Sequence, residues 1–320
     1  MTGINVAFTV DNHNLDQVAV VITSILAHSS EPSALRFFIV LDGPADVAKQ
    51  KIAGWSDRPG GPTLVPLDNR FAGRPQVGHI STAALLRTQL PNALPQLDRV
   101  LYLDADIIVR RDIAELYHSD LGDKPVGGVL DLGMYMRLRR DSVHGDPALG
   151  DYFARLGLNL HQSPYVNSGV LVMDLAALRA LDFSARALAF SEARGAELIT
   201  MDQCLINTLL SGRIALLDPR WNAFSHVLHQ PRRHHYLPRR LRADLKLQQS
   251  EPWLVHYTGP NKPWNSAEVW RAADWWAYAE TSGIGWPPAP TGGRRPSALA
   301  SAWRSVTWGL SYALARVHPD

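Results

Sequence analysis

The stretch VLYLDADIIV (residues 100–109) places two carboxylates, Asp104 and Asp106, inside a run in which the other eight residues are apolar. Such a run predicts a buried β-strand. Two buried carboxylates are costly unless they are solvated, paired with cations or bound to a metal. Residues i and i+2 of a strand point the same way, so both side chains could reach one ion. Carboxylate oxygens suit Mg²⁺ or Mn²⁺, but a turn or a salt-bridged strand end is the alternative.

Short apolar segments and helical patterns alternate on both sides of this stretch. Further strands are predicted at 4–10, 35–42, 63–67, 125–132, 168–175 and 213–218, and helices at 17–29, 45–55 and 81–94. This order predicts an α/β fold with a mostly parallel sheet and helices on both faces. Ligands of such sheets bind beyond the carboxyl ends of the strands, which is where we expect Asp104 and Asp106.

Several segments depart from this alternation. Residues 133–164 are predicted to be an insertion near a site, and the basic segment 229–246 suits an anionic glycolipid or a membrane surface, with a solvated face as the alternative. We expect a domain over 1–285, a Pro/Gly/Arg linker over 286–296 and an amphipathic helix over 297–320. That last helix either lies at a membrane interface through 297–317 or packs on the core.

Composition sets broad limits on the chain of 320 residues. Its formal net charge of +2 gives no general attraction to nucleic acid, so no nucleic-acid partner is expected. Cys204 is the only cysteine, which rules out an intrachain disulfide and suits a cytoplasmic protein. No stretch approaches the ~20 apolar residues of a membrane span. We therefore expect a cytoplasmic protein, with peripheral association at the inner face of the cytoplasmic membrane as a further expectation.

A second motif, VHYTGPNKPW (residues 255–264), complements the aspartate pair. A turn at Gly259 would bring Lys262 beside His256. An imidazole next to two carboxylates favours Mn²⁺ over Mg²⁺. Lys262 offers a point charge for a diphosphate, and Gly259 allows the backbone to approach its oxygens.

Six strings in this order resemble glycosyltransferase family 8, the retaining nucleotide-sugar transferases that include lipopolysaccharide galactosyl- and glucosyltransferases and glycogenin. They are AFTVDNH, LLRTQL, VLYLDADIIV, YVNSGVLVMDL, MDQCLIN and HYTGPNKPW. The resemblance implies a GT-A fold that binds a UDP-sugar and Mn²⁺, with Mg²⁺ as the alternative ion. It also implies transfer of galactose or glucose, with retention, to a glycan or glycolipid acceptor, as in lipopolysaccharide biosynthesis.

The resemblance also assigns candidate site residues. The metal ligands would be Asp104, Asp106 and His256. The nucleotide-sugar site would comprise Thr9, Val10, Asp11, Arg87, Asp104, Ala105, Asp131, Asn167, Ser168, Gly259 and Lys262. His13 stands where relatives often carry Asn. Simpler structural roles are the alternatives: a turn residue for Asp11, an exposed helix position for Arg87, strand-start capping for Asn167 and Ser168, and an N-cap for Asp202.

Gln203 and Asp202 are the candidate catalytic residues. Gln203 is a poor nucleophile and Asp202 a better one, and we favour attack from the leaving-group face over a covalent intermediate. The rival interpretations are a non-catalytic carbohydrate-binding protein on a transferase fold and another metal-dependent phosphate enzyme. Six tryptophans could stack on sugars, but AEVWRAADWWAYAE favours a helix packed on the body; they are Trp253, Trp264, Trp270, Trp275, Trp276 and Trp286.

Overall fold

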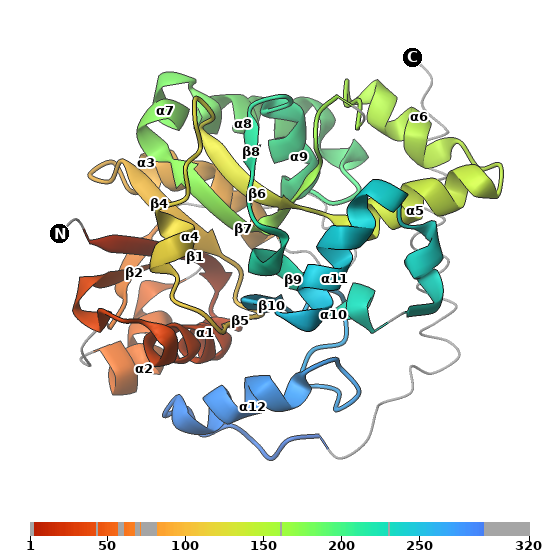
Figure 1. Cartoon of the computed structure of the whole chain (residues 1–320). Helices are drawn as coiled ribbons and strands as arrows, with labels where there is room; N and C mark the ends of the chain where they lie inside the picture. The colour runs from red at the N-terminus through yellow and green to blue at the C-terminus, as the bar shows by residue number, and fades with distance from the viewer. Residues whose placement is uncertain are drawn as a thin grey trace.

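A seven-stranded sheet with the order β3-β2-β1-β4-β7-β6-β8 forms the centre of the molecule (Figure 1). The computed structural model describes residues 3–290 apart from 43, 57–60, 68–70, 72–81, 161 and 230. The strands are β1 (Ile4–Asp11), β2 (Leu35–Asp42), β3 (Thr63–Pro66), β4 (Arg99–Leu103), β6 (Val126–Leu130), β7 (Val166–Asp174) and β8 (Ile214–Leu216). Only β7 runs antiparallel to its neighbours β4 and β6. The predicted mixed, mostly parallel sheet is confirmed.

Helices surround the sheet on both faces (Figure 1). The α-helices are α1 (Leu15–His28), α2 (Ala45–Ser56), α3 (Leu90–Ala93), α4 (Ala114–Tyr117), α5 (Leu132–Val143), α6 (Ala148–Arg155), α7 (Leu175–Ala180), α8 (Phe183–Arg194), α9 (Asp202–Leu209), α10 (Ser225–Leu228), α11 (Arg242–Ser250) and α12 (Ala272–Thr281). Short 3-10 helices are η1 (Pro32–Ala34), η2 (Thr82–Gln89), η3 (Gly195–Glu197), η4 (Pro219–Asn222), η5 (Pro231–Tyr236) and η6 (Arg239–Leu241).

Strand β4 shows why both faces of the sheet are apolar. Val100 and Tyr102 pack into one hydrophobic core with α7, α8 and α9, whereas Leu101 and Leu103 pack into a second core with α1. Alternate residues of a strand point to opposite faces, so a strand covered on both faces must be apolar throughout. The near-continuous apolar runs in the sequence follow from this two-sided burial.

The prediction of a single strand over VLYLDADIIV is wrong. The chain leaves the main sheet after Leu103 and forms β5 (Ile107–Val109) in a second sheet. Asp104 and Asp106 lie in the short connection between β4 and β5. There β5 pairs antiparallel with β10 (Leu254–His256), which pairs parallel with β9 (Ala223–Phe224). Backbone bonds fix the crossing, because Asp104 N donates to Gly169 O at 2.9 Å and Tyr257 N to Asp106 O at 2.8 Å. The two carboxylates are therefore not in strand positions i and i+2.

Other boundaries also differ from the predictions. The helix expected at 81–94 is the 3-10 helix η2 followed by α3, and the strand expected at 125–132 ends at Leu130 because Asp131 caps α5. The predicted insertion 133–164 contains α5 and α6, whose Leu149 and Phe153 are buried in the main core.

The predicted linker and C-terminal helix remain predictions. Residues 291–320 lie outside the described residues, and these include most of the predicted linker and the whole of the predicted helix 297–320. Among the helices that the structure describes, none has the length and apolar character needed to cross a bilayer.

The tryptophan-rich segment packs on the body as predicted. Trp275 is fully buried and Trp276 nearly so, in a cluster that also holds Trp264, Trp270 and Trp286. The segment becomes helical only at Ala272, later than expected. Trp253 lies apart from this cluster, with the guanidinium of Arg220 3.4 Å from its ring centre.

Candidate active site

Asp104, Asp106 and His256 converge between the two sheets. The ring atom Nε2 of His256 lies 3.1 Å from Oδ1 of Asp106 and 3.6 Å from Oδ2 of Asp104. One ligand atom from each residue falls within 4.8 Å of the others. Asp104 and Asp106 come from the β4–β5 connection and His256 from the paired strand β10, so the crossover between sheets builds the cluster.

These three residues fit a hard divalent cation. Two carboxylates and one imidazole are a donor set that suits Mn²⁺. Gly169 leaves the space they need, because a Cβ atom there would lie 2.3 Å from Cε1 of His256 and 2.6 Å from Oδ2 of Asp104. Lys262 also contacts Oδ2 of Asp106 through its ammonium group. Burial opposes ionisation of Asp106, but Lys262 and His256 outweigh it and hold its pKa well below the usual range.

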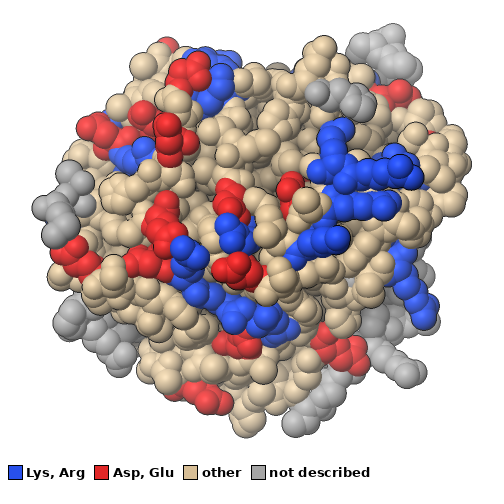
Figure 2. Space-filling view, viewed as in Figure 1, with Lys and Arg blue, Asp and Glu red and all other residues tan. Residues whose placement is uncertain are grey.

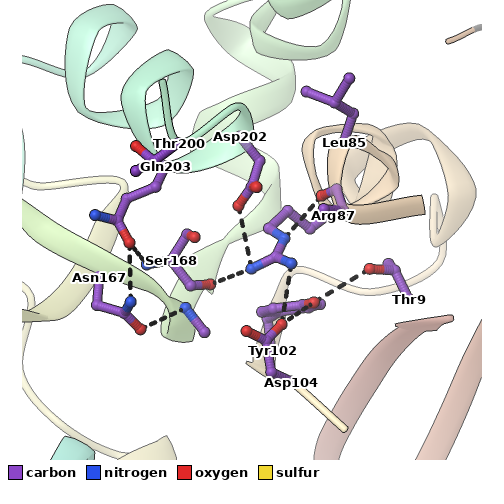
Figure 3. Close-up of polar contacts among 12 residues, drawn as sticks. Thr9, Leu85, Arg87, Tyr102, Asp104, Asn167, Ser168, Thr200, Asp202 and Gln203 are labelled. Atoms are coloured by element: carbon purple, nitrogen blue, oxygen red, sulfur yellow. Dashed lines mark hydrogen bonds and ion pairs between the residues drawn. The ribbon is translucent and has the colours of Figure 1, made fainter. Parts of the chain in front are cut away.

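Arg87 is buried and not an exposed helix residue. Figure 3 shows its contacts with Asp104, Asp202 and Ser168. Its guanidinium lies 3.0 Å from Oδ1 of Asp104 and 3.2 Å from Oδ2 of Asp202, and it donates to the carbonyl of Ser168 at 2.7 Å. Burial disfavours its charge, but Asp104 and Asp202 more than compensate and raise its pKa. The arginine therefore carries a permanent positive charge between the predicted metal ligands and the predicted catalytic carboxylate.

Tyr102 completes this side of the site, although no motif in the sequence pointed to it. Its hydroxyl donates to Oδ1 of Asp104 at 2.7 Å and lies 3.2 Å from Oγ1 of Thr9. Arg87 lies over its ring, 4.5 Å from the centre. The tyrosine belongs to the apolar run of β4, where a core role explained it equally well, so no local signal distinguished it.

Gln203 is held at both ends of its amide, and Figure 3 shows the contacts of its carbonyl end. Its Oε1 accepts from Nδ2 of Asn167 at 2.8 Å, and its Nε2 donates to Oδ2 of Asp131 at 2.9 Å. The backbone N–H of Ser168 also approaches Oε1, at 3.4 Å. Asn167 and Ser168 lie inside β7 and do not precede it. The site residues taken from the β7, α5 and α9 segments thus meet in one hydrogen-bonded group.

Asp202 is the first residue of α9 and not its N-cap, so the capping alternative is wrong. Desolvation is the main cause that raises its pKa, against the attraction of Arg87. The residue before it, Met201, has a φ of 40°, a backbone conformation that residues other than glycine seldom adopt. Such strain persists only where the surroundings impose it and is frequent at functional sites. Met201 directly precedes Asp202, which is paired with Arg87.

The loop after β10 carries Gly259 and Lys262. Gly259 has φ of 87°, as the predicted turn requires, and Lys262 reaches back to the carbonyl of Tyr257 at 2.8 Å. His226 hydrogen-bonds Thr258 through Nδ1, and a Cβ at Gly133 would lie 3.2 Å from its Nε2. His226 is exposed at the surface, and desolvation of the covered part of its ring, with the nearby charges of His256 and Lys262, lowers its pKa.

Three predicted nucleotide-site residues stand outside this network. Val10 is buried in the apolar core, and Ala105 packs against the same core. Asp11 accepts from His13 N and from Nδ2 of Asn14, both at 2.9 Å, so in this structure it stabilises the turn after β1.

Positive charge gathers on one part of the surface, over α5 and α11 (Figure 2). Helix η5 packs on α5, where Nε2 of His144 and the hydroxyl of Tyr236 lie 2.8 Å apart. Seven exposed cations in this region form no ion pair with any residue that the structure describes: Arg139, Arg232, Arg233, Arg239, Arg240, Arg242 and Lys246. We call this set the basic surface. The charge of Arg233 contributes, after desolvation and nearer charges, to lowering the pKa of His226.

Comparisons with known proteins show which sequences and folds the chain is similar to. The model of glycosyl transferase family 8 matches residues 5–268. The chain is 28% identical over 280 residues to the lipopolysaccharide 1,2-glucosyltransferase of Escherichia coli strain K12, which covers 86% of this chain and 77% of that protein. It is 25% identical over 251 residues to general stress protein A of Bacillus subtilis strain 168, with 76% and 81% covered.

Solved structures show the same fold. The galactosyltransferase LgtC, crystallised in complex with donor and acceptor sugar analogs, superposes with a TM-score of 0.72 at 24% sequence identity. The match covers 89% of this chain and 98% of that one. The predicted GT-A architecture is confirmed.

Proposed function

Since the chain belongs to glycosyl transferase family 8, we propose that it is a retaining, Mn²⁺-dependent hexosyltransferase that uses a UDP-sugar. The observation that carries this proposal is the convergence of Asp104, Asp106 and His256 beside a buried Arg87 and the amide of Gln203. The relatives include a glucosyltransferase and a galactosyltransferase, which supports glucose or galactose as the transferred sugar.

The charged residues suit departure of a nucleoside diphosphate. Asp104, Asp106 and His256 would hold the ion, which when bound neutralises charge on the diphosphate. Lys262 adds a second positive charge at the same place, and such a contact at about 4 Å is worth on the order of 4 kcal/mol at an effective dielectric constant of about 20. Gly259 lets the backbone approach the phosphate oxygens.

The sugar would lie against Asn167, Gln203 and Asp131, whose mutual hydrogen bonds fix their orientation. Asp202 is ion-paired with Arg87, and this pairing makes it a weak nucleophile. We therefore favour front-face attack, in which the acceptor hydroxyl approaches from the side of the leaving phosphate and gives its proton to a phosphate oxygen. Holding the hydroxyl near the anomeric carbon supplies a large part of the rate.

The basic surface supports an anionic glycolipid as the acceptor. Its seven exposed cations suit phosphate or carboxylate groups near the reacting hydroxyl. An acceptor of this kind agrees with the substrate in the name of the relative lipopolysaccharide 1,2-glucosyltransferase. It also agrees with peripheral binding of the protein at the inner face of the cytoplasmic membrane.

A donor screen tests the proposal. UDP release is measured from UDP-galactose, UDP-glucose and UDP-GlcNAc with a saccharide acceptor in Mn²⁺, and the anomeric configuration of the product is determined by NMR. We expect one hexose donor to dominate and the α-linkage of the donor to be kept. An inverted product would contradict a retaining transferase. Binding of UDP-sugar without any UDP release would instead support the non-catalytic alternative.

A slow donor analogue separates the two retaining routes. Front-face attack predicts that mass spectrometry of the treated protein finds no sugar bound to it. A covalent adduct on Asp202 would contradict that route and identify this carboxylate as the nucleophile.

A further inference from the structure

Asn222 lies between the predicted metal site and the predicted sugar pocket, in the short helix η4. It is fully buried. Its Oδ1 lies 2.9 Å from Nδ1 of His256, and its Nδ2 donates to Oδ1 of Asn167 at 3.0 Å. No motif marked this residue, because it lies in the segment between the recognised strings.

The hydrogen bonds around Asn222 fix the direction of each donor. The backbone N–H of Gly169 donates to Oδ1 of Asn167 at 2.9 Å, so that atom is an acceptor. The group of Asn222 that faces it must then be the NH₂, and its carbonyl oxygen faces His256. Nδ1 of His256 therefore carries the proton, and Nε2 is the nitrogen that faces Asp104 and Asp106.

The chain of bonds continues in the same direction. Nδ2 of Asn167 donates to Gln203, and Nε2 of Gln203 donates to the carboxylate of Asp131. In each hydrogen bond of this series, the donor lies on the His256 side and the acceptor on the Asp131 side. Hydrogen bonds aligned in this way polarise one another, and a bond to the far nitrogen of a histidine ligand fixes the ring and raises its basicity.

We infer that Asn222 is a positioning residue that fixes the ring of His256 and ties it to the Asn167–Gln203 pair. One series of hydrogen bonds then fixes side-chain orientations in both the metal site and the sugar pocket. The inference rests on the metal dependence proposed above. It adds that the metal site and the sugar pocket are not independent, because the side chain of Asn222 hydrogen-bonds a residue of each.

Two substitutions separate the two bonds of Asn222. Asn222→Ala removes both. Asn222→Asp keeps an oxygen for Nδ1 of His256 but sets a carboxylate oxygen against the acceptor oxygen of Asn167. Gln248→Ala is the matched control, because buried Gln248 donates to the backbone carbonyls of Asn222 and Pro219, each at 3.2 Å, and contacts neither site.

The experiment measures Mn²⁺ affinity of the full chain by electron paramagnetic resonance, without donor, and then KM for the UDP-sugar. Asn222→Ala is expected to weaken Mn²⁺ binding about 10- to 100-fold. Asn222→Asp should keep Mn²⁺ affinity within roughly threefold, because carboxylates also serve as second partners of histidine ligands, but should raise KM. Gln248→Ala should leave both values near those of the wild type.

Each failure has a different meaning. Wild-type affinity in Asn222→Ala, or an equal loss in Gln248→Ala, would overturn the positioning role while the proposed function stands. An unchanged KM in Asn222→Asp would overturn the tie to the sugar pocket. A wild-type protein that binds no Mn²⁺ would overturn the proposed metal dependence and this inference with it.

Discussion

Gly169 lies against two predicted metal ligands and has no room for a side chain. A Cβ there would lie 2.3 Å from the ring of His256 and 2.6 Å from the carboxylate of Asp104, so one of these ligands must move in Gly169→Ala. We expect at least a roughly tenfold loss of Mn²⁺ affinity, measured by electron paramagnetic resonance, since displaced ligands cost no less than lost second partners.

Gly54→Ala in α2 is the control for this substitution. A Cβ at Gly54 would meet nothing within 4 Å. Alanine favours a helix over glycine by about 0.5–1 kcal/mol, so this variant should be slightly more stable and should bind Mn²⁺ as the wild type does. Unchanged Mn²⁺ affinity in Gly169→Ala would contradict the assigned ligands.

Arg87 provides a prediction about stability. Arg87→Met leaves the carboxylates of Asp104 and Asp202 without their shared counter-charge, and removal of one partner of a buried pair costs about 3–5 kcal/mol. Urea unfolding measures the loss. Lys49→Met, which breaks an exposed pair with Asp46, should cost below about 0.5 kcal/mol. Equal costs in the two variants would contradict the role of Arg87 as a buried counter-charge.

At the scale of elements, the break within VLYLDADIIV could not be predicted from the sequence. Both halves are apolar enough for strands, and nothing local shows that β5 joins a different sheet from β4. The partner of β5 is β10, roughly 150 residues further along the chain, and only their pairing forces the break. Asp104 and Asp106 were still predictable as a pair, because the chemistry of two carboxylates in an apolar run does not depend on that topology.

Candidate site residues could be predicted from the sequence where they belong to a motif. Those that lie in segments explained by core packing could not. His256, Lys262 and Gln203 lie in strings with recognisable spacing, and the structure brings them together. Asn222 and Tyr102 lie in segments whose sequence is explained by burial alone. Their functions depend on partners that are distant in the sequence, which local patterns do not reveal.

Helix α12 supports the loop that carries Lys262. Nε1 of Trp276 donates to the carbonyl of Pro263 at 3.1 Å, and the ring of Trp275 lies 5.2 Å from that of Trp264. Trp275→Ala should cost about 3–5 kcal/mol in urea unfolding and should raise KM for the donor. Leu247→Ala, at an exposed position of α11, should change neither value. An unaltered KM for a folded Trp275→Ala would show that the loop does not depend on α12.

At the scale of the whole molecule, His226 predicts how stability depends on pH. His226 is exposed at the surface, and desolvation of the covered part of its ring together with nearby positive charge lowers its pKa from the ordinary value of 6.5. The unfolded chain therefore takes up a proton near pH 6.5, whereas the folded protein takes one up at a lower pH. Stability from this residue is fully present above pH 6.5 and declines below it, by an amount that solvent screening at the exposed ring keeps small.

His226→Gln removes this contribution. Urea unfolding in EDTA should lose less stability between pH 7 and pH 5 in this variant than in the wild type. His118→Gln, at a second exposed histidine that follows α4 and lies outside the His226–Thr258 contact, should follow the wild type. A variant that declines as steeply as the wild type would show that His226 is not held neutral.

The two sheets together form the site, since β4 and β7 belong to the larger sheet and β5 and β10 to the smaller. The central claim is that the cluster where they meet, Asp104, Asp106 and His256, binds the divalent ion that transfer requires. This claim is distinct from the fold, which the chain shares with transferases of its family.

The most direct test measures UDP release against free Mn²⁺ for the wild type and for Asp106→Asn. Saturable dependence on Mn²⁺, no release in EDTA, and a loss of Mn²⁺ affinity of at least roughly tenfold in the variant are predicted. Equal turnover of the wild type in EDTA and in Mn²⁺ would contradict the account.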